Sequence, residues 1–428
     1  MAESGVAADA AATAALPEDV HPPWCNDAVV AQQAAPQPTV DVAEPPPGGE
    51  SVQAGGTTFN VPSHYKLQSW LGHGTYGSVA AFNDTIEDRS VAVKKIPNPF
   101  RNRIDGKRCL REIKLLRVLD HECIIKLLDV LSPPSPDFQE VYLVTELMDA
   151  DLHMLITNSG QALSEDHVQF FTYNIFRALL YLHSANVVHR DLKPLNVLVN
   201  KNCDIKLCDF GLARGRAGFS QEDNDWLRTE YVGTRWYRAP EVVLTSMEYT
   251  AAVDIWGAGC ILAELIGRLP LFKGRDFLDQ IRSICEVLGT PSEDELAFIP
   301  PEHEAARTYV RTHFPALPRK QWAAVFPEAS PAQHELLDRL LRFDPGSRLT
   351  AQQALQDPYL ADYHDDEEEL VAPAHVDWSF DDEEAEAAQI RHLVYEEAAA
   401  FHPEILERDR EVLEARGLFP ALGSPASS

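Results

Sequence analysis

One short segment of the chain carries a carboxylate, an ammonium group and an amide in close succession. They are Asp191, Lys193 and Asn196 in the run His189-Arg-Asp-Leu-Lys-Pro-Leu-Asn196, and Asp209 follows in Asp209-Phe-Gly211. Carboxylate and amide oxygens are hard ligands that suit Mg²⁺. A second carboxylate can accept the proton of an attacking hydroxyl group. The spacing therefore indicates a site that combines a metal ion with a general base.

A glycine-rich segment lies upstream of this loop, in Leu71-Gly-His-Gly-Thr-Tyr-Gly-Ser-Val79. Backbone N–H groups there can approach a phosphate because glycine has no Cβ, although a tight hairpin turn is an equally good interpretation. Lys94 follows in a strand pattern that places a cation beneath the loop, whereas Lys95 better fits an exposed strand lysine. Glu112 could pair with Lys94, but a solvated helix glutamate is the more frequent case.

The elements that must position these groups fall into two parts. Up to Met148, short β-branched runs such as Ser90–Val93 and Val141–Val144 predict strands, with one helix around Leu110–Leu119. After Asp149 the spacing becomes helical, most clearly over Phe171–Leu182. Two short strands, Val197–Val199 and Ile205–Cys208, interrupt the helices. We therefore expect a small β-rich lobe joined to a larger helical lobe near Glu146–Ala150.

The two ends of the chain differ from its middle. Residues 1–63 are rich in Ala, Pro and Gln and show no sustained apolar period, which predicts disorder. The formal net charge of -29 is concentrated in the ends, because residues 361–428 hold 19 Asp and Glu against four Arg, and no Lys or Arg precedes Lys66. Such a surface excludes nucleic-acid binding and favours basic peptide partners.

Cysteine use and hydropathy indicate the compartment. The seven Cys include no C-x-x-C pair, and no basic n-region precedes an apolar h-region, so we expect a reducing, intracellular environment. The most apolar long stretch, Val253–Gly267, is interrupted by Asp254 and Glu264. It is also shorter than the roughly 18 to 20 residues that cross a bilayer, so no membrane span is expected.

Taken in order, these motifs make the chain resemble the protein kinase family. The resemblance rests on the glycine loop, Lys94, Glu112, the His189 loop, Asp209-Phe-Gly211 and Ala239-Pro-Glu241, and it covers residues 65 to about 360. It implies the α+β, bilobal protein kinase fold. The implied divisions are a disordered extension (1–63), a small lobe (64–147), a large lobe with an insert (148–360) and an acidic docking segment with a C-terminal extension (361–428).

The resemblance implies ATP and Mg²⁺ as the groups bound, and a role for each side chain. Lys94 would hold the α- and β-phosphates with Glu112 orienting it. Asp209 and Asn196 would hold Mg²⁺, and Asp191 would accept the substrate proton. Two further catalytic positions are implied, Lys193 near the transferring phosphoryl group, and Thr234.

The resemblance also implies an adenine pocket in the small lobe. Thr145 matches the gatekeeper position, and the backbone around Leu147 and Met148 would hydrogen-bond the base. The other nucleotide-binding positions that it implies are Leu71, Gly72, His73, Gly74, Thr75, Tyr76, Gly77, Ser78, Val79 and Ala92.

Thr229-Glu-Tyr231 resembles the activation motif of the MAP kinases, with the Glu of their extracellular-signal-regulated branch. The hinge at Leu147–Leu152 and the long stretch Leu271–Pro327 are similar to the same family. The loop that begins at Gly211–Gly215 resembles fungal cell-wall-integrity MAP kinases. Two alternatives remain open, a cyclin-dependent kinase relative, which shares the run up to Glu241, and a pseudokinase scaffold.

Arginines stand where phosphates on this motif would need them. Three cations gathered behind the loop would repel one another without an anion, so a phosphate on Thr229 would satisfy them. They are Arg111, Arg190 and Arg214, and the pair placed to take a phosphate on Tyr231 is Arg235 and Arg238. The alternative is an unmodified loop whose hydroxyls hydrogen-bond locally.

The acidic run Asp365-Asp-Glu-Glu-Glu369 follows Pro358-Tyr359-Leu360 and coincides with the common docking site of MAP kinases. A solvated charge run is the alternative. The resemblance implies that Asp365 and Glu368 bind basic docking motifs of substrates and phosphatases. It also implies an upstream dual-specificity MAP kinase kinase, targets with Ser or Thr before Pro, a monomer, and a cytoplasmic and nuclear location. Ile390–Glu397 resembles the helix that returns to the small lobe.

Overall fold

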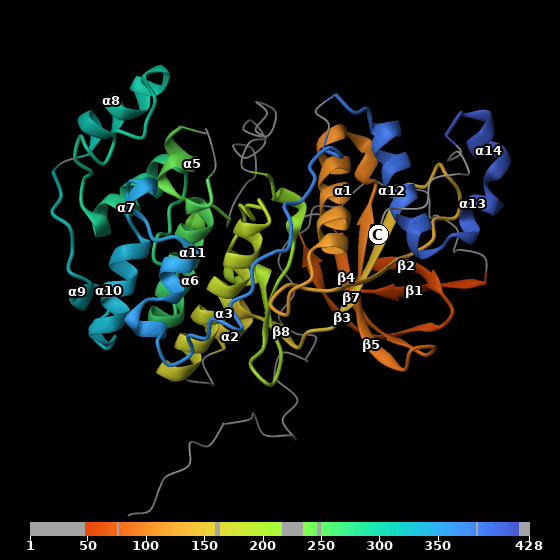
Figure 1. Ribbon diagram of the computed structural model, residues 1–428, viewed down its shortest axis with the longest axis horizontal. Helices are drawn as coiled ribbons and strands as arrows, with labels where there is room; N and C mark the ends of the chain where they lie inside the picture. The colour runs from red at the N-terminus through yellow and green to blue at the C-terminus, as the bar shows by residue number, and fades with distance from the viewer. Residues whose placement is uncertain are drawn as a thin grey trace, which may run out of the picture.

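The computed structural model describes residues 48–74, 77–158, 163–215, 234–245, 250–314, 316–381 and 384–418. A β-rich lobe and a larger helical lobe lie side by side (Figure 1). The helical lobe is followed by a C-terminal segment, drawn in blue, that runs back across to the β-rich lobe. The predicted α+β, two-lobed architecture is confirmed.

The small lobe is built on a five-stranded antiparallel sheet of order β3-β4-β5-β7-β6. Its strands are β3 (Tyr65–Gly74), β4 (Gly77–Asp84), β5 (Arg89–Pro97), β6 (Leu127–Val130) and β7 (Glu140–Glu146). In β5 the side chains of Val91 and Val93 are fully buried, and Ala92 and Lys94 point to the opposite face because successive strand residues alternate. The register places Ala92 opposite Thr145 and Lys94 opposite Val79.

Helix α1 (Arg103–Val118) packs beside this sheet. The Asn102 side chain caps the first turn of α1 by accepting a hydrogen bond from the Asp105 N–H. This N–H is one of the first few in a helix that have no carbonyl partner within the helix. Leu110 and Ile113 anchor the helix in the core. Their burial fixes the rotation of α1 about its axis. It therefore also fixes the direction in which the side chain of Glu112, which lies between them in the sequence, points.

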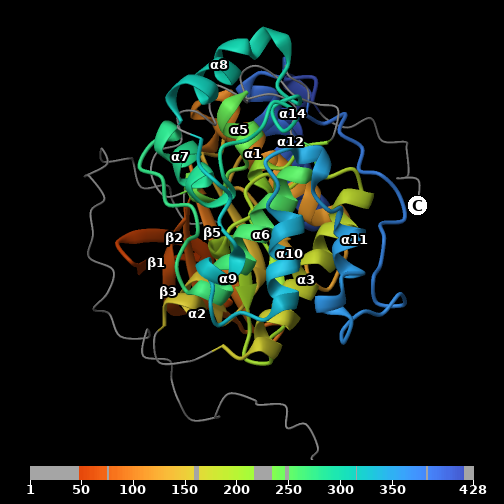
Figure 2. The same cartoon turned by 90° about the vertical axis from the view of Figure 1, so that its left-hand side faces the viewer.

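The helical lobe is arranged around α6 (Ala252–Gly267), with α3 (Glu165–Ser184) and α10 (Pro331–Leu340) packed against it (Figure 2). A reciprocal cap between Ser164 and His167 starts α3. The other helices are α2 (Leu152–Thr157), α5 (Pro240–Leu244), α7 (Phe277–Leu288), α8 (Glu304–His313), α9 (Trp322–Val325) and α11 (Ala351–Leu355). A three-stranded sheet holds β8 (Ala150–Asp151), β9 (Val197–Val199) and β10 (Ile205–Leu207).

The end of the described chain packs on the small lobe through α12 (Ala387–Phe401), α13 (Glu404–Arg408) and α14 (Arg410–Ala415). The Glu397 carboxylate on α12 pairs with Lys114 and with Arg117, whose Nη1 lies 2.5 Å away. A Cβ on Gly106 would come within 3.2 Å of Ile390, so α1 and α12 approach closely there. The predicted return helix is confirmed.

The prediction of disorder before residue 64 was wrong for residues 49–62. They form a hairpin of β1 (Gly49–Ala54) and β2 (Thr57–Pro62), turned by Gly55 and Gly56, both with positive φ. Phe59 and Val61 are fully buried against the sheet, and the Phe59 ring lies 5.8 Å from that of Phe82. Two buried apolar residues are too few to produce a recognisable strand pattern in the sequence. In the folded chain they pack against apolar side chains of the five-stranded sheet. Residues 1–47 lie outside the described residues.

Among the described residues, no helix is both long and apolar enough to cross a membrane. The most apolar helix, α6, is almost wholly buried in the helical lobe. Its two acidic residues, Asp254 and Glu264, are buried with it and make hydrogen bonds there.

We predict that Phe59→Ala lowers the free energy of unfolding by about 3 to 5 kcal/mol, because it leaves a cavity among Trp70, Phe82 and Tyr142. Urea denaturation checks this. Ile86→Ala is the control, since Ile86 is 69% exposed and its loss is expected to change stability by about 0.5 kcal/mol or less. Equal stability of the Phe59 variant and the wild type would show that the hairpin is not part of the folded core.

Candidate active site

A buried ion pair joins the sheet of the small lobe to helix α1. Lys94 Nζ lies 2.6 Å and 2.9 Å from the two carboxylate oxygens of Glu112. The same ammonium lies 3.7 Å from Asp209 Oδ1. Strand β5, helix α1 and the loop after β10 therefore bring together three of the predicted site residues.

Lys94 and Asp209 stabilise each other's charged forms. Burial lowers the pKa of Lys94, but the Glu112 and Asp209 carboxylates outweigh it, so the pKa lies above its ordinary value. Burial likewise opposes the charged form of Asp209, yet the Lys94 and Lys193 cations hold the pKa of Asp209 below its usual range. At neutral pH the site therefore presents an ammonium group beside an ionised carboxylate.

The loop His189–Asn196, the predicted catalytic loop, holds a second cluster of site residues. Asp191 Oδ2 accepts from Lys193 Nζ at 2.6 Å and from Asn196 Nδ2 at 3.0 Å. The Asn196 amide also donates to the Asp191 carbonyl at 2.8 Å. Because both donors meet Oδ2, the oxygen that remains to accept a proton from a hydroxyl group is Oδ1. The Asn196 amide oxygen is likewise the atom of that side chain that can face a cation.

Asp254, which in the sequence only interrupts an apolar stretch, anchors this loop. Its side chain is fully buried and accepts from the backbone N–H groups of His189 and Arg190, both at 2.8 Å, and from His183 Nε2 at 2.9 Å. Burial would raise the pKa of Asp254, but the His183 hydrogen bond lowers it below its ordinary value. A charge inside an otherwise apolar helix was the signal that could have found it.

A second buried anchor lies behind the Ala239-Pro-Glu241 motif. Arg348 donates to both carboxylate oxygens of Glu241, at 2.6 Å and 2.7 Å, and its side chain is fully buried. This two-pronged pair fixes the start of α5 against the rest of the helical lobe. Nothing local in the sequence marks Arg348 as its partner.

Two residues of the site adopt a left-handed backbone conformation that is uncommon outside glycine. Asp209 has φ 65° and Arg190 has φ 70°. The Asp254 carboxylate holds Arg190 in this conformation through its N–H. For Asp209 the same conformation turns the carboxylate toward Lys94. Such strain persists only where the surroundings impose it, which is typical of functional sites.

The glycine-rich segment forms a hairpin between β3 and β4. A Cβ on Gly77 would lie 2.2 Å from the Lys95 carbonyl oxygen, so only glycine fits there. His73 Nδ1 and Ser78 Oγ are 3.0 Å apart across the hairpin. Leu71, Gly72, Gly74 and Val79 lie on the same two strands. Thr75 and Tyr76 lie outside the described residues.

The predicted adenine-side residues line up at the end of the sheet. Thr145 lies on β7 opposite Ala92, and Leu147 and Met148 follow where the chain leaves β7 for the helical lobe. All four are partly buried. Ala92 and Lys94 are alternate residues of β5 and so lie on the same face of the sheet, and a nucleotide with its base against Ala92 and Thr145 would direct its phosphates toward the ion pair.

The activation motif itself, Thr229 and Tyr231, lies outside the described residues, and of Thr234 only the backbone can be placed, in the turn Thr234–Tyr237. Of the five predicted phosphate-binding arginines, Arg111 and Arg214 meet at one carboxylate, that of Asp381. Arg190 Nη1 instead donates to the Leu212 carbonyl. Arg235 lies over the Phe277 ring, 5.7 Å from its centre, and Arg238 is buried nearby.

Comparison with known proteins agrees with this geometry. The sequence profile described as protein kinase domain matches residues 65–360. The chain is 49% identical over 352 residues to mitogen-activated protein kinase 5 of Oryza sativa subsp. indica, covering 82% of this chain and 93% of that protein. It is 47% identical over 382 residues to mitogen-activated protein kinase 6 of Arabidopsis thaliana, covering 87% and 93%. The chain belongs to the MAP kinase family of protein kinases.

Membership confirms the predicted serine/threonine protein kinase, which works in a cascade with an upstream kinase and protein substrates. The reaction of this family uses ATP and Mg²⁺. The donor chemistry fits both, since Lys94 can meet phosphate oxygens and Asp209 and Asn196 offer oxygen ligands. Assignment to the cell-wall-integrity branch stays a prediction.

We predict that Asp254→Asn lowers kcat of this MAP kinase about 10- to 100-fold. The amide would turn an N–H₂ group toward a backbone N–H of the catalytic loop, and a hydrogen bond to a charged group contributes about 1.5 to 3 kcal/mol. ATP affinity should change little because Lys94 and Glu112 are untouched. Steady-state kinetics check this, with Glu264→Gln in the same helix as control. Unchanged kcat would mean that Asp254 does not position the loop.

Proposed function

We propose that this MAP kinase phosphorylates Ser or Thr followed by Pro, and that it is activated by phosphorylation of Thr229 and Tyr231. The observation that carries the catalytic part is the Asp191 carboxylate, with Oδ2 held by Lys193 and Asn196 and Oδ1 left for the substrate hydroxyl. Mg²⁺ bound by Asp209 and Asn196 would neutralise the charge of the phosphates.

The chain's own residues then divide the work. Asp191 orients the hydroxyl group and accepts its proton, Lys193 stabilises the charge that develops beside it, and Lys94 holds the nucleotide phosphates. Glu112 keeps Lys94 in place through their two hydrogen bonds. Each of these groups is more than nine-tenths buried except Lys94, so water competes little for their contacts.

Activation by phosphate draws support from the charges behind the loop. Arg111 and Arg214 are almost fully buried and converge on one carboxylate, so their surroundings already accommodate an anion. Phosphate carries more charge and one more oxygen than a carboxylate. Arg235 is held by the Phe277 ring and donates to the Arg275 carbonyl, so it would have to leave these contacts to bind a phosphate on Tyr231.

The size of the effect follows from population arithmetic. Moving a loop from about 1% to 99% active needs roughly 5.5 kcal/mol. A phosphate forms about one to three charge-assisted hydrogen bonds, each contributing about 1.5 to 3 kcal/mol. Two phosphates therefore suffice, whereas one falls near the margin. Proline after the target residue suits a site without a hydrogen-bond acceptor, because it has no N–H to leave unpaired.

We expect the doubly phosphorylated protein to turn over a Ser-Pro peptide about 100-fold faster than the unmodified form and severalfold faster than either singly phosphorylated form, with a matched Ser-Ala peptide much slower. Thr229→Ala and Tyr231→Phe supply the singly modified forms. Asp191→Asn, phosphorylated in the same way, is the control that should lose about 10²- to 10⁴-fold in turnover yet still bind ATP. Similar rates in all forms, or no preference for proline, would overturn the proposal.

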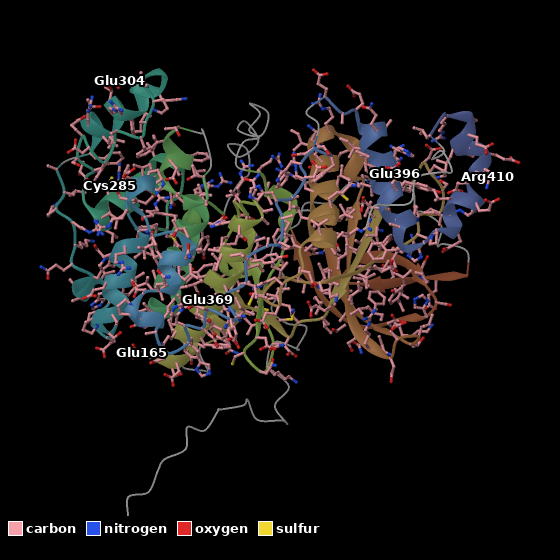
Figure 3. All side chains as sticks on the ribbon, viewed as in Figure 1. Glu165, Cys285, Glu304, Glu369, Glu396 and Arg410 are labelled. Atoms are coloured by element: carbon pink, nitrogen blue, oxygen red, sulfur yellow. The ribbon has the colours of Figure 1, made fainter. Side chains whose placement is uncertain are left out.

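We further propose that Asp365 and Glu368 dock basic motifs of substrates and phosphatases. Arg177, which is buried on α3, donates to the Glu368 carbonyl at 3.1 Å and 2.8 Å and so holds the backbone of the run. The Glu368 side chain is 62% exposed, although its carboxylate lies 3.8 Å from Arg177 Nη2, and Asp365 is exposed. Figure 3 shows neighbouring Glu369 on the helical lobe, well away from Glu396 and Arg410 on the small lobe.

Changing Asp365 to Asn and Glu368 to Gln together should raise KM about two- to thirty-fold for a protein substrate with a basic docking motif, and leave a short Ser-Pro peptide unaffected. Exposed ion pairs contribute about 0.2 to 1 kcal/mol each, and salt should reduce the difference. The matched control is Glu404→Gln with Glu411→Gln, which removes the same charge from α13 and α14. An equal loss on both substrates would contradict docking.

A further inference from the structure

A carboxylate from the C-terminal segment lies between the two buried arginines. Asp381 Oδ1 accepts from Arg111 Nε at 2.9 Å and lies 2.8 Å from Arg111 Nη2. Arg214 Nε is 3.7 Å from the other carboxylate oxygen. All three side chains are nearly removed from solvent, with 4%, 3% and 11% exposed for Arg111, Arg214 and Asp381. Burial strengthens these attractions relative to a surface pair.

The two arginines belong to the parts of the site that must be aligned. Arg111 directly precedes Glu112 on α1, and Glu112 grips Lys94. Arg214 follows the Asp209-Phe-Gly211 motif. A carboxylate that binds both therefore ties helix α1 to the segment that carries Asp209.

The segment that delivers Asp381 is itself held on the helical lobe. The Val376 N–H donates to the Ala185 carbonyl at 2.9 Å, and Trp378 Nε1 donates to the Asn186 carbonyl at 3.2 Å. Trp378 also packs on Gly215, where a Cβ would lie 2.7 Å from its indole nitrogen. The blue segment in Figure 1 follows this route from the helical lobe toward α12.

The contacts next to α1 are looser. Between the segment 372–380 and the ends of α1 and α3 lies a cavity of about 370 Å³, lined in part by Lys114, Val118 and Tyr181. The segment is therefore not packed tightly along its whole length.

We propose that Asp381 is a positioning residue for phosphoryl transfer: it supplies the anion for Arg111 and Arg214 while the activation loop is unmodified, and so holds α1 where Glu112 pairs with Lys94. This inference rests on the proposed function in one respect, because phosphate on Thr229 is the group that takes over the same arginines. The exchange needs no bond to form or break in Asp381. Its carboxylate leaves the arginines when a group of higher charge arrives.

The test compares Asp381→Asn with Asp377→Asn in the full chain. Asp377 lies in the same segment, is exposed, and bonds to Ser379 instead of an arginine, so its variant removes the same charge from the same backbone. In unmodified protein we expect Asp381→Asn to weaken Mg-ATP binding about tenfold by calorimetry and to speed hydrogen exchange in α1, with Asp377→Asn unchanged. Asp381→Glu, which keeps the charge, should restore most of the affinity.

The same comparison in phosphorylated protein distinguishes a positioning role of Asp381 from a merely structural one. In the doubly phosphorylated protein, Asp381→Asn should match wild-type ATP affinity and KM within about twofold, and wild-type amides 376–381 should exchange faster than before phosphorylation. A loss of equal size in both forms would assign Asp381 a merely structural role and overturn the inference, as would wild-type affinity in the unmodified variant. If instead the proposed activation by phosphorylation is wrong, the phosphorylated and the unmodified wild-type proteins will have the same turnover, whatever the Asp381 variants show.

Discussion

The Lys94–Glu112 ion pair is the interaction on which the rest of the active site depends. A buried pair repays the loss of water only when its geometry is well held, because each charge loses several kcal/mol of hydration in the interior. Strand β5 fixes Lys94 through Val91 and Val93, which are fully buried. Glu112 is different, since it sits on a helix whose position is set by what packs around it.

Helix α1 is braced by parts of the chain that lie far along the sequence. Helix α12 packs along it, and Glu397 pairs with both Lys114 and Arg117. Asp381 meets Arg111 across a separation of 270 residues. The C-terminal extension therefore belongs to the catalytic unit in a physical sense, although the family profile ends at residue 360.

The residues of the candidate site were predictable, because phosphoryl transfer needs given groups at given spacings and those spacings are local. Lys94, Asp191, Asn196 and Asp209 stand where their motifs place them. Partners of buried charges were not predictable, because burial is a property of the folded chain. In the sequence, Asp254 is only a charge within an apolar helix, and its partners in the catalytic loop are seen only in the folded structure. The β1–β2 hairpin was missed for the same reason, although Gly55-Gly56 is a turn signal.

The site therefore combines two kinds of support. Asp254 holds the catalytic loop and Arg348 holds the start of α5. Both side chains are fully buried and charged, and their partners all lie in the helical lobe. Releasing either would strand a charge away from water, so these anchors are unsuited to switching. Helix α1 instead rests on ion pairs with the C-terminal segment, and in the proposed exchange a phosphate replaces the Asp381 carboxylate at Arg111, so that the buried arginine keeps an anion throughout. A modification that adds charge near α1 can thus change the position of Glu112 without disturbing Asp191, which separates control of the enzyme from its chemistry.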